Sequence, residues 1–161
     1  MTLRAVLEDD TIVAVSTPPG GALRAIVRLS GPHAFSVLDS RLERSGSSAS
    51  PARRVAADRL RLRCGRSVSG TIVRLRGPAT YTREDVAEFH CVGSPPVVRE
   101  VLATFVDAGA RIADPGEFTR RAFRNGRIDL VQAEAVLGLV VARTDDERRC
   151  ASESLAGAFG R

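Results

Sequence analysis

The residues with the clearest chemical pattern in this chain are arginines that recur at every second position in two neighbouring segments. Side chains of a β-strand alternate between its faces, so this spacing predicts one arginine face and one apolar face. Residues 46–80 hold eight arginines and one acidic residue, a net charge of +7, against +5 for the whole chain. An anionic partner would stabilise such a face, and RNA phosphate is the simplest candidate. The predicted face contains Arg59, Arg61, Arg63, Arg74 and Arg76.

An ordinary solvated sheet face explains the same arginine pattern. All 24 basic residues of the chain are arginine, a bias that a GC-rich genome can produce without any selection for RNA binding. No aromatic residues lie between these arginines, which argues against base stacking of the kind that single-strand binders use. A weak tRNA contact and a solvated face therefore both remain open.

The absence of lysine excludes two kinds of chemistry. A phosphate-binding P-loop needs a lysine, and so does Schiff-base catalysis. Metal ligands are also scarce, because three cysteines and two histidines are scattered along the chain without a Cys-x-x-Cys pair. The sequence therefore predicts neither a GTP site nor a metal site in this chain. These five residues are Cys64, Cys91, Cys150, His33 and His90.

Composition predicts a globular protein that crosses no membrane. The chain has 161 residues, of which 43% are hydrophobic, enough for one core. No stretch approaches the roughly 18 apolar residues of a membrane span. The first ten residues are acidic and lack the apolar core of a secretory signal. We therefore expect a cytoplasmic protein.

Residues 1–128 have the alternating pattern of an α+β domain. Strands are predicted at 11–16, 25–29, 86–92 and 110–113, with a hairpin of strands at 55–64 and 69–76. Helices are predicted from Pro32 to about Arg44 and from Ser94 to about Asp107, and a loop at 45–50. The predicted fold is a mixed or antiparallel sheet with flanking helices.

Residues 114–161 have the signals of consecutive helices. Asp114 can cap a first helix that Asn125 and Gly126 end. Asp129 can cap a second, and Thr144 can begin a third. The helix from Asp129 carries more apolar residues than one neighbour can cover. We therefore expect residues 129–161 to be the beginning of a truncated helical domain.

Several separated motifs resemble the N-terminal part of the MnmE/TrmE family of tRNA-modification GTPases. The resemblance covers nearly the whole chain in order and spacing. The matching segments are 11–20 (TIVAVSTPPG), 26–31 (IVRLSG), 81–88 (YTREDVAE) and 115–136, with 154–159 (SLAGAF) resembling the start of the helical domain.

The resemblance implies a function for this chain. In the family this part binds 5-formyl-tetrahydrofolate and forms a homodimer. Whole family proteins, together with the MnmG flavoprotein, modify the wobble uridine of certain tRNAs at carbon 5. The chain is therefore expected to hold a folate one-carbon carrier, while GTP hydrolysis belongs to a domain absent from it.

The resemblance also implies three folate contacts. A carboxylate can accept the adjacent amino and ring N–H groups of a pterin, the role implied for Glu88. Arginine forks suit the folate carboxylates or the formyl group, the roles implied for Arg28 and Arg127. Each residue also has a plain structural explanation, as a strand-edge charge, an exposed strand position and a helix-terminal base.

The chain departs from the family pattern at several positions. Arg83 stands where the family commonly has glycine, and Arg127 where it usually has lysine. The turn at Gly20 and Gly21 and the run at 90–94 are also altered. A dimerisation or interaction module with a degenerate folate pocket is therefore one alternative function. An arginine-rich tRNA-binding adaptor is another.

Overall fold

A six-stranded sheet forms the centre of the N-terminal part of the protein. The computed structural model describes residues 10–43 and 53–158. Within these residues the strand order is β3-β4-β5-β2-β1-β6, and neighbouring strands are antiparallel except β1 and β6. The mixed sheet with its helices confirms the predicted α+β class. The strands are β1 (Ile12–Val15), β2 (Ala22–Ser30), β3 (Arg53–Arg61), β4 (Ser67–Leu75), β5 (Val86–Gly93) and β6 (Arg111–Ile112).

The described residues divide into two compact units. The first lies within Met1–Thr80 and Glu84–Ala113, and the second comprises Tyr81–Arg83 and Asp114–Arg161. The first unit therefore contains the whole sheet, whereas the later helices belong to the second. A division into folding domains at residue 129 stays a prediction.

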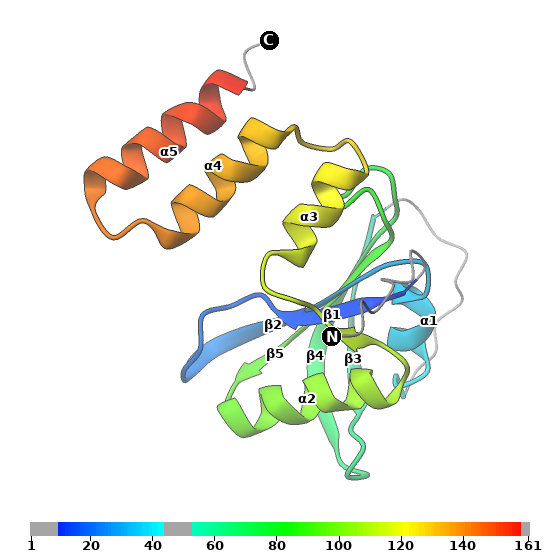
Figure 1. Ribbon diagram of the computed structural model, residues 1–161. Helices are drawn as coiled ribbons and strands as arrows, with labels where there is room; N and C mark the ends of the chain where they lie inside the picture. The colour runs from blue at the N-terminus through cyan, green and yellow to red at the C-terminus, as the bar shows by residue number, and fades with distance from the viewer. Residues whose placement is uncertain (1–9, 44–52, 159–161) are drawn as a thin grey trace, which may run out of the picture. The chain divides into compact units, whose positions relative to one another are not determined.

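Two helices cover one face of the sheet in the first unit (Figure 1). They are α1 (Ala34–Asp39) and α2 (Pro95–Asp107). Both contact β5, and α2 also contacts β1 and β2. Between helices and sheet lies the core, where Phe89, Phe105 and Leu38 are fully buried. Burial of such side chains is the main favourable term in folding.

The opposite face of the sheet carries the polar residues of the central strands. Register pairs Arg28 of β2 with Glu88 of β5, and Glu88 in turn with Val73 of β4. Because paired residues point to the same face, these three form one row across the sheet. His90 lies two residues along β5 and so shares this face. We call this side of the sheet, opposite α1 and α2, the Glu88 face.

Helix α1 is shorter than predicted. It ends at Asp39 rather than near Arg44, and Arg44 and the predicted loop at 45–50 lie outside the described residues. The backbone N–H of Glu43 donates to Arg59 O, and Leu42 forms a β-bridge with Leu60. Residues 41–43 therefore extend the edge of the sheet instead of the helix, because a buried leucine satisfies both packing and backbone bonding there.

The described residues of the second unit form three helices, α3 (Glu117–Arg124), α4 (Leu130–Val141) and α5 (Asp145–Ala158). The prediction that Asp114 caps α3 is wrong, since Gly116 is the N-cap in a left-handed conformation, φ 76°. The Glu117 carboxylate instead accepts the backbone N–H of Asp114 at 2.8 Å. The backbone N–H of Asp114, which precedes the helix, is thus satisfied by the side chain of the first helical residue.

The other predicted caps are confirmed. Gln132 N donates to Asp129 Oδ1 at 2.8 Å, and Gln132 Oε1 accepts the Asp129 N–H at 2.9 Å. Glu147 N donates to Thr144 Oγ1 at 3.2 Å in the same manner. These reciprocal bonds satisfy backbone donors that a helix leaves unpaired.

Helix α4 exposes much of its apolar surface, as the sequence predicted. The exposed apolar side chains of α4 are Leu130, Val131, Leu137, Val140 and Val141.

None of the described helices combines the length and apolar character of a membrane span.

Candidate ligand-binding site

Two of the three predicted ligand residues meet on the Glu88 face. Arg28 Nε donates to Glu88 Oε1 at 2.8 Å, although the residues are 60 positions apart in sequence. They meet because the β2–β5 register places them directly opposite each other. The terminal guanidinium nitrogens of Arg28 make no hydrogen bond with the described residues, and the side chain is 34% exposed.

A third side chain, which the sequence analysis did not assign to the site, completes this cluster. His90 Nε2 lies 2.8 Å from Glu88 Oε2. The Glu88 and His90 side chains are 12% and 15% exposed. The signal was in the sequence: positions two apart in a strand share a face. The sequence alone placed His90 in the altered run at 90–94 and among scarce metal-ligand candidates, but did not pair it with Glu88.

The electrostatics of the cluster keep Glu88 ionised. Burial by itself would raise the pKa of the Glu88 carboxyl, but the hydrogen bond with His90 and the charge and hydrogen bond of Arg28 outweigh it, so the pKa is lowered. An ionised carboxylate can only accept hydrogen bonds. The chemistry of the cluster therefore suits a ligand that presents N–H donors.

Arg127, the third predicted residue, belongs to the second unit. It is exposed and follows Gly126, whose φ of +70° ends α3 as predicted. The backbone N–H of Arg127 donates to Ala122 O at 2.8 Å, which holds the turn but leaves its side chain exposed. A role for Arg127 beside Arg28 and Glu88 stays a prediction.

Arg83 adopts a backbone conformation that explains why glycine suits its position. Its φ is +59°, within the left-handed region. Arg83 Nη1 donates to Asn125 O at 3.3 Å, and Asn125 Nδ2 donates to Thr82 O at 2.6 Å. These bonds tie residues 82–83 to the end of α3 within the second unit, and they offset the strain of a side chain at positive φ.

The predicted arginine face is wrong in its geometry. Register pairs Arg59 with Ser69 and Arg61 with Ser67, so both lie on the Glu88 face. Arg74 has the opposite parity, shares the face of Leu60 and Ile72, and pairs with Asp39. The sequence pattern establishes the alternation within each strand, but only the register relates the two strands.

Acidic residues from other elements also neutralise part of the arginine charge. Arg59 Nε lies 3.5 Å from Glu43 Oε2, and Arg63 Nη2 lies 3.2 Å from Glu100 Oε1. The guanidinium of Arg76 stacks over Phe35 instead, with its carbon 5.7 Å from the ring centre. Arg61 has no side-chain partner among the described residues. A tRNA contact through these arginines stays a prediction.

Two surface hollows are lined by residues that do not belong to the Glu88 cluster. One of about 380 Å³ lies in the first unit, between the β1–β2 turn and the start of α2. Its lining residues are Val15, Thr17, Pro18, Pro19, Gly20, Ala25, Pro95, Val98 and Arg99. Since Val15 and Ala25 lie on the helix-covered face, this hollow is on the other side of the sheet from Glu88.

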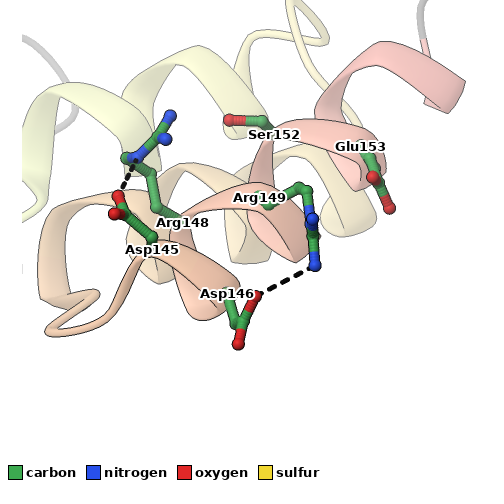
Figure 2. A pocket seen from close by; sticks show the side chains of 6 residues that line it. All are labelled: Asp145, Asp146, Arg148, Arg149, Ser152 and Glu153. Carbon is green, nitrogen blue, oxygen red and sulfur yellow. Dashed lines mark hydrogen bonds and ion pairs between the residues drawn. The ribbon is translucent and has the colours of Figure 1, made fainter.

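The second hollow, about 480 Å³, lies along α5 (Figure 2). Its charges are paired within the helix, Arg148 with Asp145 at 3.3 Å and Arg149 with Asp146 at 2.9 Å. Such exposed pairs at i, i+3 are ordinary helix-surface contacts. Glu153 also lines the hollow and has no ion pair among the described residues, so the hollow offers no uncompensated positive charge to an anionic ligand.

The fold and the charged row define an α+β domain with two helices on one face of a mixed sheet and a carboxylate clamped by two basic side chains on the other. The chain belongs to the MnmE/TrmE family, as its N-terminal domain: the family model for the GTP-binding protein TrmE N-terminus matches residues 11–127.

Curated relatives agree with this assignment. The chain is 46% identical to the tRNA modification GTPase MnmE of Halorhodospira halophila over 162 residues, covering 98% of this chain and 34% of that protein. The MnmE of Chlorobium luteolum is 43% identical over 158 residues, covering 95% of this chain and 33% of the relative. That of Geobacillus kaustophilus is 46% identical over 156 residues, 93% and 34% respectively. The chain thus spans about a third of the length of these relatives.

Proposed function

We propose that this chain is the folate-binding and dimerising part of a protein that modifies the wobble uridine of tRNA. The single observation that carries the ligand assignment is the Glu88 carboxylate. It is an ionised, largely buried acceptor on a sheet face, with both oxygens already oriented by neighbouring side chains. When bound, 5-formyl-tetrahydrofolate would supply a one-carbon unit.

In this proposal Glu88 binds the pterin ring. A carboxylate has about four lone-pair sites, of which Arg28 and His90 use one on each oxygen. The remaining lone pairs can accept the adjacent amino and ring N–H groups of a pterin as a pair. Such charge-assisted, two-point bonds are stronger and more directional than neutral ones.

The two arginines bind the acidic end or the formyl oxygen. The Arg28 side chain is 34% exposed beside Glu88, and Arg127 is exposed in the turn after α3. Arginine supplies a planar fork that matches a carboxylate. The tail and the formyl group are both anionic or polar acceptors, so either can bind either arginine.

The partners of the chain are part of the same proposal. The family resemblance implies a homodimer that acts with an MnmG-type flavoprotein, and the relatives' name, tRNA modification GTPase, supports tRNA as the substrate. GTP hydrolysis is not assigned to these 161 residues, because they contain no lysine for a phosphate-binding loop.

Calorimetric titration with 5-formyl-tetrahydrofolate tests the ligand assignment. We expect saturable binding that Glu88→Gln weakens at least tenfold, because the amide turns an N–H toward a donor and charge-assisted bonds of about 1.5–3 kcal/mol are lost. Glu100→Gln is the matched control, since it removes a partly exposed glutamate of α2 that pairs with Arg63. It should bind as the wild type.

The same titration separates folate binding from the alternative, an interaction module with a degenerate pocket. No heat of binding from a dimeric wild-type chain, with the dimer established by sedimentation, would refute the folate assignment and favour that alternative. Binding by a chain that stays monomeric at all concentrations would instead refute dimerisation and leave the ligand assignment standing.

A further inference from the structure

The Glu88 carboxylate is clamped at both oxygens by side chains of its own sheet face. Arg28 Nε contacts Oε1 and His90 Nε2 contacts Oε2, each at 2.8 Å. A glutamate side chain has three rotatable bonds, so one contact would leave the plane of its carboxylate free to turn. Two contacts, one on each oxygen, hold that plane.

Paired strands, rather than loops, set the position of His90. Its register partners are Ile26 on β2 and Thr71 on β4, so β5 is held on both edges. Beside it, Gly70 allows a close approach, because a Cβ there would lie 2.6 Å from the His90 carbonyl oxygen. Sites supported by paired strands keep their geometry better than sites on loops.

His90 therefore differs from Arg28 in what it offers a ligand. Arg28 contacts Glu88 through Nε alone among the described residues, and its side chain is 34% exposed. The His90 side chain is only 15% exposed and its Nε2 is engaged with Glu88. The His90 imidazole therefore acts on a ligand indirectly, by orienting the Glu88 carboxylate that would bind it.

We propose that His90 is a positioning and specificity-determining residue, which holds the Glu88 carboxylate so that the site selects a flat ring with two adjacent N–H donors. The inference rests on the proposed function and goes beyond it by assigning a residue and a selectivity. In a ring with a carbonyl in place of the amino group, the carbonyl oxygen would face a Glu88 carboxylate oxygen, and both are hydrogen-bond acceptors. A held carboxylate cannot turn to avoid that contact, whereas a loose one can.

Two measurements test this assignment in the full chain. One is the affinity for 5-formyl-tetrahydrofolate. The other is the preference for pterin over lumazine, whose ring has a carbonyl where pterin has the amino group, measured as displacement of bound folate. We expect His90→Ala to lower the folate affinity about tenfold and to reduce the pterin preference. His90→Gln, which keeps an N–H donor at similar reach, should restore most of both.

Two further variants guard against a merely structural effect. His90→Phe keeps a ring without a donor and should behave like His90→Ala, even if the smaller residue impairs folding. His33→Ala removes the other histidine, an exposed residue with no side-chain capping bond, and should match the wild type.

The outcomes separate this inference from the proposed function. Wild-type binding with unchanged affinity and preference in His90→Ala or His90→Phe would overturn the role of His90 alone. Failure of His90→Gln to recover in a folded protein would overturn it as well. Absence of folate binding by the wild type would overturn the proposed function, and the inference with it.

Discussion

Replacing Gly70 by alanine should disrupt the contact between β4 and β5. A Cβ at this position would lie 2.5 Å from Phe89 Cζ and 2.6 Å from the His90 carbonyl oxygen. Real Cβ atoms do not approach so closely. Phe89 is fully buried in the core and cannot turn away without moving its neighbours, and the carbonyl is part of a paired strand.

The size of the effect follows from two opposing terms. Alanine is favoured over glycine in a regular strand by about 0.5–1 kcal/mol, because it loses less chain entropy. Overpacking a filled core costs about 1–3 kcal/mol, and more where backbone must shift. With a backbone oxygen and a buried ring both too close, we expect a net loss of about 2 kcal/mol. For a chain of this length that lowers the melting temperature by about 6 °C.

Urea unfolding followed by circular dichroism measures this loss in the free energy of unfolding. Gly21→Ala is the control, because a Cβ there meets nothing within 4 Å and its φ is not in the left-handed region. A Gly70→Ala protein as stable as Gly21→Ala would refute the close approach of β4 to β5. Because the shift falls on His90, we also expect weaker folate binding in Gly70→Ala.

Two other predictions concern charged pairs. The lowered pKa of Glu88 stabilises the fold above the ordinary glutamate value of 4.5, and that contribution is lost as pH falls through the lower, folded-state value. In Glu88→Gln the melting temperature should therefore fall less steeply as the pH is lowered below 4.5. A fall as steep as in the wild type would contradict the pKa shift. In α3, Arg121 Nη2 lies 3.1 Å from Glu117 Oε1, with the side chains 3% and 0% exposed. Arg121→Met should cost about 3 kcal/mol, because it removes one partner of the buried Glu117 carboxylate. Adding Glu117→Gln should recover part of that loss in urea unfolding, and a further loss would argue against the pairing.

The local elements of the fold follow from short stretches of sequence. The hairpin, α2 and the cap at Asp129 depend on alternation, helical spacing and a side chain within reach of its own backbone. The helix and the cap involve residues three or four positions apart, and the strands of the hairpin are joined by a short turn, so all three can be predicted without a fold. Where a distant partner competes, prediction fails: residues 41–43 leave α1 because the backbone of β3 bonds them.

The candidate site shows the same limit. Glu88 and Arg28 were identified by resemblance and by their chemistry, but nothing local indicated that they contact each other. His90 was overlooked as a partner of Glu88, although its spacing allowed the contact. The acids that pair with Arg63 and Arg74 come from helices, and no strand pattern could assign them.

By itself, then, the sequence determined the identities and order of strands and helices, the caps of α4 and α5, the absence of lysine chemistry and the family. Tertiary structure decided which charges meet. The register of β3 against β4 separates Arg74 from Arg59, and the register of β2 against β5 joins Arg28 to Glu88. The reason is physical: alternation assigns side chains to faces within one strand, whereas the pairing of strands is set by the burial of a shared core, which depends on the whole unit at once.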